Sequence, residues 1–140
     1  MSSRIDQIVA THIKKFKTND PFKIAAANNI IVKFWTFNNN EVFGIYRYER
    51  RNRFVFINRN LPISQQIFTC GHEVFHALYH TRMNTLFLSK NTLYPVGRFE
   101  REASEYSTKL LLYGISKNSD MTKGTVCKEY GIPYEMQQYM

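Results

Sequence analysis

One stretch near the middle of the chain combines candidate metal ligands with apolar residues at helical spacing: Thr69-Cys70-Gly71-His72-Glu73-Val74-Phe75-His76-Ala77-Leu78-Tyr79-His80. It contains the pattern His-Glu-x-x-His, formed by His72, Glu73 and His76. In a helix, residues four positions apart lie one turn apart and about 40° apart in rotation, so both imidazoles would share one face. Two neutral imidazoles can bind one zinc ion, and the neighbouring carboxylate can take a proton from a water molecule. The stretch therefore predicts a zinc site suited to peptide hydrolysis; the alternative is two core histidines bonded to carbonyl groups.

The residues around this pattern predict a helix that is buried on most sides. Ile67, Cys70, Val74 and Leu78 form one apolar stripe, which neighbouring aromatic residues widen beyond about a third of the helix circumference. The helix is expected to begin near Pro62, since proline fits the first helical positions. A helix buried in this way suits a metal site from which water is excluded.

A second helix, predicted for residues 98–112, carries the candidate third ligand. Ala103 and Ser107 are small and share a face with Glu100, so two helices could approach closely there. Glu100 would then reach the zinc ion, and two histidines with one glutamate leave an open position, as in catalytic zinc sites. The alternative is that Glu100 is an acid favoured in the first turn by the helix dipole.

Two further histidines are expected to have other roles. His80 lies one turn beyond His76 and is too far along the helix axis to bind the same ion comfortably. We expect it at the helix end, where a partly cationic ring suits the dipole. His12 lies at the edge of an apolar helical face, which indicates a core or rim residue.

Length and composition are those of one globular domain spanning residues 1–140, because 44% of the 140 residues are hydrophobic. No stretch approaches the roughly 20 apolar residues of a membrane span, and the first residues do not form an apolar signal segment. The two cysteines, Cys70 and Cys127, are far apart and outside any Cys-x-x-Cys pair. We therefore expect a cytoplasmic protein with no membrane partner.

The pattern along the chain predicts an α+β fold. Helices are expected at residues 3–17 and after Asp20, and strands at residues 30–37, 44–50 and 53–58. Short links between successive strands predict a three-stranded antiparallel sheet, packed against a helical core that carries both ligand helices. Residues 81–99 are the least patterned segment; Leu86–Leu88 could form a short strand or a lid, and the segment is a candidate wall of the substrate site.

Positive charge leaves several interpretations open. The net charge is +8, and five arginines fall between positions 47 and 59, interleaved with aromatic residues. They could form a basic patch for nucleic acid or an acidic protein, or they could be the solvated face of a hairpin. Residues 125–133 predict a short helix, a glycine turn and another short helix, which is either a helix-turn-helix or a tail packed against the other helices.

With these residues in view, the chain resembles the ImmA/IrrE family of small bacterial and phage metallopeptidases. The resemblance covers most of the chain and rests on these residues: Asp20-Pro21, Ala25, Ile30, Phe68-Thr69, His72-Glu73-x-x-His76, Glu100-x-x-Ala103, Tyr106, Leu110-Leu111 and the tail from Val126 to Pro133. Two residues depart from the family pattern. Phe75 stands where many members have glycine, and Ser104 stands where many have asparagine or aspartate. The shorter Ser104 hydroxyl is expected to orient a ligand histidine less firmly.

The resemblance implies a compact gluzincin-like metallopeptidase. It implies Zn²⁺ held by His72, His76 and Glu100, with Glu73 as the catalytic base. It also implies an anti-repressor, encoded by a prophage or integrative element, that cleaves or otherwise inactivates a helix-turn-helix repressor.

Three functions remain open from the sequence. The first is a site-specific zinc endopeptidase that binds its substrate as an added strand, with Tyr94, Arg98 and Tyr106 as candidates to stabilise the oxyanion. The second is an anti-repressor that binds and sequesters the repressor without cutting it. The third is a regulator that binds DNA directly through the basic hairpin or the tail; we expect this least, because the second helix of the tail is short for a recognition helix.

Overall fold

The computed structural model of the chain describes residues 3–39, 41–88, 97–115 and 122–140. Its helices are α1 (Arg4–Phe16), α2 (Pro21–Ala27), α3 (Ile63–Tyr79), α4 (Arg98–Leu111), α5 (Lys123–Tyr130) and the 3₁₀ helix η1 (Tyr134–Tyr139). Its strands are β1 (Ile31–Trp35), β2 (Val42–Glu49), β3 (Asn52–Asn58) and β4 (Thr85–Leu88). The α+β class is therefore confirmed. Among the helices described, none has the combined length and apolar character that crossing a membrane requires.

The predicted three-stranded antiparallel sheet is wrong in strand number and in pairing. The sheet has four strands in the order β1-β3-β2-β4. β1 pairs in parallel with β3, whereas β3 and β4 both pair antiparallel with β2. Alternating apolar residues reveal which face of a strand is buried, but they do not reveal its neighbour. β1 and β2 are consecutive in the chain but are not neighbours in the sheet, because β3 lies between them. The fourth strand, β4, comes from the least patterned segment and pairs with β2.

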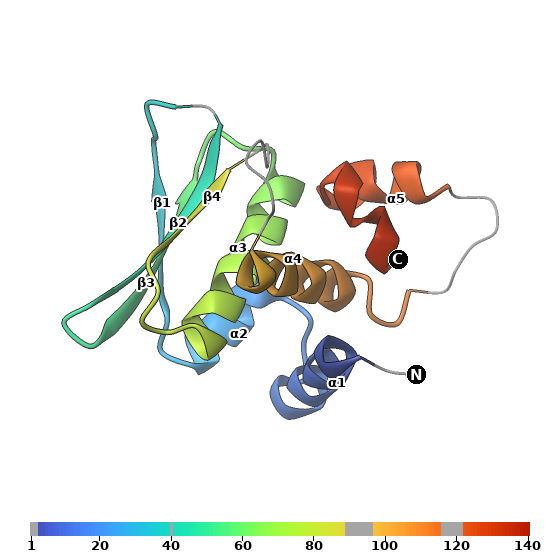
Figure 1. Cartoon of the computed structure of the whole chain (residues 1–140), viewed down its shortest axis with the longest axis horizontal. Coiled ribbons are helices and arrows are strands. Elements are labelled where there is room, and N and C mark those ends of the chain that lie inside the picture. The colour runs from blue at the N-terminus through green and yellow to red at the C-terminus, as the bar shows by residue number, and fades with distance from the viewer. Residues whose placement is uncertain (1–2, 40, 89–96, 116–121) are drawn as a thin grey trace.

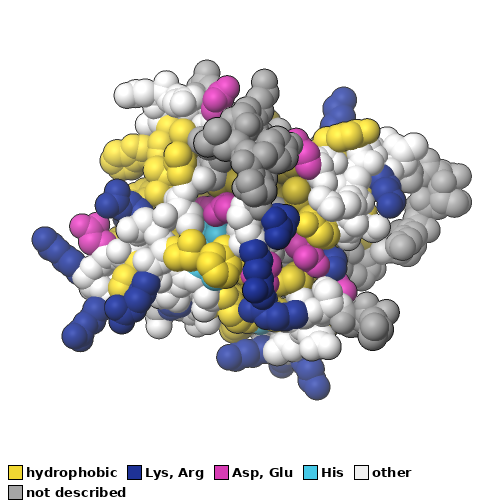
Figure 2. Space-filling view, in the orientation of Figure 1, with side chains coloured by type: hydrophobic (Ala, Val, Ile, Leu, Met, Phe, Trp, Pro, Cys, Tyr) yellow, Lys and Arg dark blue, Asp and Glu magenta, His cyan; other side chains and the backbone are white. Residues whose placement is uncertain are grey.

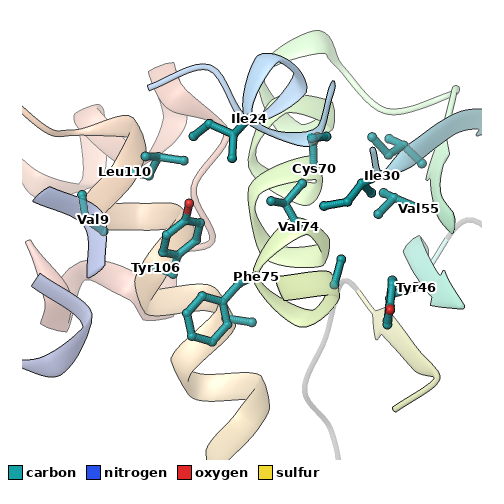
Figure 3. Packing of buried hydrophobic residues seen from close by; sticks show 14 of the residues in the cluster. Val9, Ile24, Ile30, Tyr46, Val55, Cys70, Val74, Phe75, Tyr106 and Leu110 are labelled. Atoms are coloured by element: carbon teal, nitrogen blue, oxygen red, sulfur yellow. The ribbon is translucent and has the colours of Figure 1, made fainter. Parts of the chain in front are cut away.

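Helix α3 lies at the centre of the molecule, with the sheet on one side of it and α4 on the other (Figure 1). Side chains from five elements meet around it: Val9 of α1, Ile24 of α2, Tyr46 and Val55 of the sheet, and Tyr106 of α4 are all buried (Figure 3). Because apolar partners surround it, α3 is buried continuously from Phe68 to Ala77. The predicted burial of this helix on most sides is confirmed.

Local sequence signals set the first elements. The Ser3 side chain accepts a hydrogen bond from the Asp6 backbone N–H, and the Asp6 side chain accepts one from the Ser3 backbone N–H, which caps α1. Asp20 caps α2 through the Phe22 N–H, with proline at the first helical position. After α2, Asn29 adopts a φ of 57°, which asparagine tolerates better than most residues. These caps fix where the chain turns toward β1.

The tail packs against the helical core. Gly131 adopts a φ of 68° after α5 and lies so close to α3 that an added Cβ would come within 2.4 Å of the Ser64 backbone carbon. Cys127, Ile132 and Met136 join the same buried cluster as Phe68 of α3. The last helix, η1, is a six-residue 3₁₀ helix. This arrangement favours the packed-tail interpretation over a helix-turn-helix.

Helices α3 and α4 approach each other closely at Gly71. An added Cβ on Gly71 would lie 2.3 Å from Ser107 Oγ and 3.1 Å from Ser107 Cβ. The Ser107 hydroxyl donates a hydrogen bond of 2.7 Å to the Phe68 carbonyl, which links the two helices without a long side chain between them. The expected close approach at Ser107 is thus present, and Gly71 provides the matching space on α3.

The substitution Gly71→Ala should destabilise the fold by about 1–3 kcal/mol, because a methyl group would push α4 away from α3. Urea denaturation followed by circular dichroism measures the change in the free energy of unfolding. Gly124→Ala is the matched control: an added Cβ there meets nothing closer than 3.8 Å, and alanine favours the α5 helix. Equal stabilities of the two variants would contradict the close contact.

Candidate functional site

Helix α3 supplies the three residues of the His-Glu-x-x-His pattern to one buried position. His72, Glu73 and His76 are each at most 1% exposed. One nitrogen or oxygen atom from each lies within 4.8 Å of those of the other two, so this group could hold a metal ion. The Glu73 Oε1 atom lies 3.7 Å from His72 Nε2. The helical spacing predicted from the sequence thus brings these side chains together.

Helix α4 brings Glu100 to the same position. Its Oε2 lies 3.0 Å from His72 Nε2, and its Oε1 lies 2.9 Å from His76 Nε2. The Glu100 side chain is 32% exposed, so the carboxylate closes the buried group on the side that faces solvent. Figure 2 shows histidine atoms and an acidic side chain near the middle of one face of the molecule, bordered by hydrophobic and basic side chains.

The donor atoms fit a cation better than they fit one another. Among the described residues, Glu73 Oε1 and His76 Nε2 are buried side-chain atoms without a hydrogen-bond partner. His76 Nε2 is only 2.9 Å from Glu100 Oε1, yet the contact lacks the direction that a hydrogen bond needs. Unpaired polar atoms are costly inside a protein; a bound cation would satisfy His76 Nε2, and a water molecule would satisfy Glu73 Oε1. Two imidazoles and a carboxylate are the donor set of many catalytic zinc sites.

The electrostatics of the group agree with this donor set. Burial lowers the pKa of His72, which favours the neutral imidazole that a metal requires, although Glu100 partly opposes the change. Burial also raises the pKa of Glu73 well above its ordinary value, and the negative charge of Glu100 adds to this. Burial alone would raise the pKa of Glu100 too, but the close imidazoles of His72 and His76 hold it well below its usual range. A bound cation would favour ionisation of Glu73, which the metal-free pocket disfavours.

Similarity to known proteins now identifies the family. The profile of the IrrE N-terminal-like domain, a metallopeptidase family, matches residues 39–139, which include every residue of the group just described. The chain belongs to the IrrE N-terminal-like domain family. It is also 38% identical over 128 residues to "Uncharacterized immunity region protein 2" of Bacillus phage phi105, a match that covers 89% of this chain and 80% of the phage protein. No solved structure is significantly similar to it. The ImmA/IrrE resemblance seen in the sequence is confirmed.

Both candidate ligand histidines of this IrrE-like domain, His72 and His76, also have a contact at the second ring nitrogen. His72 Nδ1 lies 3.0 Å from the Ser104 hydroxyl, the residue expected from the sequence to orient a ligand histidine. His76 Nδ1 lies 2.9 Å from His80 Nδ1. His80 terminates α3 as predicted, but burial lowers its pKa, so the expected partly cationic ring is not favoured.

Strand β4 supplies a wall of the site that the sequence identified only as a segment. The Phe87 ring stacks on His72 with 3.9 Å between ring centroids, and the Thr85 hydroxyl lies 3.5 Å from Glu73 Oε2. The apolar run at Leu86–Leu88 was the one signal for this strand, and it predicted neither the contact with His72 nor the contact with Glu73. These residues belong to a strand, so the prediction of a short strand is confirmed and the alternative prediction of a lid is not.

The remaining candidates lie elsewhere. His12 is buried as expected, and its two ring nitrogens contact the hydroxyls of Tyr106 and Tyr79, at 2.7 and 2.9 Å. The Tyr106 hydroxyl is thereby engaged by His12 and not by the candidate ligands. The Arg98 side chain is 74% exposed and lies 3.7 Å from Glu102, not at the site. Tyr94 lies outside the described residues.

Replacing Glu73 with glutamine should change how stability depends on pH. Because its pKa is raised in the folded protein, Glu73 keeps a proton that the unfolded chain releases above about pH 4.3. As pH rises above that value, the wild-type protein should lose stability relative to E73Q by up to about 1.4 kcal/mol per pH unit, until the folded-state pKa is reached. Urea denaturation of both metal-free proteins at a series of pH values measures this difference.

Glu129→Gln is the matched control for this experiment, since Glu129 is exposed on α5. Its stability should follow that of the wild-type protein at every pH. Stability curves of the wild type and E73Q that stay parallel across the range would show that Glu73 ionises normally.

Proposed function

We propose that this IrrE-like domain is a zinc-dependent, site-specific endopeptidase that acts as an anti-repressor. Its substrate is a helix-turn-helix repressor of a prophage or mobile element, in the cytoplasm of the bacterial host. The observation that carries the proposal is the convergence of Glu100 on both imidazoles, with Glu73 beside them. Membership of a metallopeptidase family supports the chemistry, and similarity to a protein of a phage immunity region supports the regulatory role.

In this proposal His72, His76 and Glu100 hold the ion, and their donor atoms suit zinc better than magnesium or calcium, which prefer oxygen ligands alone. When bound, the ion supplies Lewis acidity that polarises the scissile carbonyl and lowers the pKa of the attacking water toward about 7. Three protein ligands leave a coordination position for substrate. The buried surroundings strengthen these charge interactions, because little water competes for them.

Glu73 is the general base of the proposed reaction. Its Oε1 has no hydrogen-bond partner among the described residues, so this atom is free to accept a proton from the attacking water. The contact of its other oxygen with the Thr85 hydroxyl, at 3.5 Å, would help hold the carboxylate in one orientation. The protonated acid can then transfer the same proton to the amine of the departing peptide.

The substrate binds, in this proposal, as an extended peptide along β4. This strand is last in the sheet order, and its only strand partner among the described residues is β2, so its other edge can accept a further strand. Thr85 and Phe87 connect β4 directly to Glu73 and His72. A peptide paired with β4 would therefore pass beside the metal-binding group, with its backbone held by sheet hydrogen bonds.

The basic hairpin gives less support to direct DNA binding. Arg53 donates hydrogen bonds to the carbonyls of Asn28 and Ala77, and Arg59 donates one to the Phe34 carbonyl. Two of the five arginines in this segment are thus engaged within the fold: Arg53 ties β3 to α3 and to the end of α2, and Arg59 ties the end of β3 to β1. The proposal therefore has a protein, rather than a nucleic acid, as the partner.

The substitution Glu73→Gln should abolish repressor cleavage while zinc remains bound. Removing a general base costs roughly 10²–10⁴-fold in rate, and Glu73 is not among the proposed ligands. The measurement combines zinc content, determined by atomic spectroscopy, with electrophoresis of a purified repressor encoded beside the gene. Glu129→Gln, on the surface of α5, is the control and should cleave at the wild-type rate.

Two outcomes of that experiment would contradict the proposal that this protein is a protease. Cleavage by E73Q at the wild-type rate would exclude Glu73 as the base. If E73Q cleaves nothing but still relieves repression fully in cells, the protein acts by binding and sequestering the repressor instead.

Replacing the proposed third ligand should weaken zinc binding. Glu100→Gln removes the negative charge that lies within 3.0 Å of both imidazoles and should raise the zinc dissociation constant at least about 100-fold. Competition with a coloured chelator measures this constant. Glu102→Gln is the control, because Glu102 lies on the same helix but pairs with Arg4. Unchanged zinc affinity in E100Q would remove Glu100 from the ligand set.

A further inference from the structure

The contact between His76 and His80 joins the two rings at equivalent atoms. Their Nδ1 atoms are 2.9 Å apart, so one nitrogen must carry a proton and the other must accept it. The opposite nitrogen of His76, Nε2, faces Glu100 at 2.9 Å but is not in hydrogen-bonding geometry with it. A histidine that binds a metal through Nε2 must carry its proton on Nδ1. These facts favour His76 Nδ1–H as the donor and His80 Nδ1 as the acceptor.

We propose that His80 is a positioning residue, which accepts the Nδ1–H of His76 and so directs His76 Nε2 at the metal. This inference rests on the proposed metal-binding function. His80 touches His76 on the side of the ring away from Glu100, so it acts behind the ligand rather than as a further ligand. It does for His76 what the Ser104 hydroxyl, 3.0 Å from His72 Nδ1, does for the other imidazole. Each ligand ring is then held by one side chain at its rear nitrogen.

The surroundings of His80 hold its ring in the orientation that this role requires. Its backbone N–H donates to the His76 carbonyl at 2.8 Å, and its own carbonyl accepts from Met83 at 2.9 Å. Phe75 and Phe99 pack against the ring, with centroid distances of 5.5 and 4.3 Å. The acceptor nitrogen is thus fixed by both backbone and packing.

Phe99 links this contact to the other half of the metal-binding group. It precedes Glu100 in the first turn of α4, so the same helix end contacts His80 through Phe99 and His76 through Glu100. Glu100 contacts His76 at Nε2 and His80 contacts it at Nδ1. Helix α4 carries Glu100 itself and contacts His80 through Phe99. A change at His80 should therefore affect the direction of His76 Nε2 more than the packing of the core.

Two substitutions separate orientation from packing. His80→Phe keeps an aromatic ring against Phe75 and Phe99 but has no acceptor, whereas His80→Asn offers an amide oxygen at the place of Nδ1. Zinc competition with a coloured chelator should show an affinity about 10–100-fold lower for H80F and within about threefold of wild type for H80N. The absorption spectrum of the cobalt-substituted proteins, which reports ligand geometry, should change in H80F and be restored in H80N. Ser104→Ala provides the comparison for His72.

The outcomes distinguish this inference from the proposed function. Equal zinc affinities in wild type, H80F and H80N, or equal losses in both variants, would overturn the positioning role. If the wild-type protein bound no zinc, the proposed function would fail, and nitrogen NMR of the metal-free protein would still decide the role of His80. That measurement should find His76 protonated at Nδ1 in the wild type and shifted toward Nε2–H in H80F; an unchanged His76 tautomer in H80F would contradict the inference.

Discussion

The site depends on how closely α3 and α4 can pack. All polar atoms of the candidate metal-binding group, which consists of His72, Glu73, His76 and Glu100, converge from these two helices. Side chains as short as histidine and glutamate meet only if the helix axes are near each other. Gly71 and Ser107 make this possible. Gly71 has no side chain, and the short Ser107 side chain fills the remaining space while its hydroxyl donates a hydrogen bond to the Phe68 carbonyl. The small residues therefore set the distance at which Glu100 reaches both imidazoles.

The sheet contributes to the site through the order of its strands, which determines the side chains that lie against α3. Gly44 of β2 lies so close to α3 that an added Cβ would be 2.6 Å from Thr69 Cγ2, and this brings the inner strand β2 against the helix. Because β4 pairs with β2, the Phe87 ring stacks on His72 and Thr85 approaches Glu73. The predicted three-stranded sheet lacks β4, so it would not place Phe87 and Thr85 beside His72 and Glu73.

The residues of α3 were predictable because their information is local. The spacing of His72, Glu73 and His76 fixes their common face once the segment is helical, and the apolar stripe fixes the helix. Glu100 could be inferred from its shared face with Ala103 and Ser107, since small residues indicate a close neighbour. The parallel pairing of β1 with β3 and the contact of Phe87 could not be inferred, because strand neighbours are chosen by tertiary packing. The contact of His80 with His76 Nδ1 could not be predicted for a related reason: a helical wheel places a residue on a face but does not show which ring nitrogen it meets.

The division of the proposed ligands between helices has a thermodynamic consequence. His72, His76 and Glu73 belong to one helix and stay together even if α4 moves away, but Glu100 lies 28 residues beyond His72 and joins them only when α4 is docked. Any ion that binds all three ligands must therefore bind the docked arrangement more tightly than the undocked one. By linkage, occupancy of the site and docking of α4 stabilise each other, so metal availability and the tertiary integrity of the C-terminal half would rise and fall together.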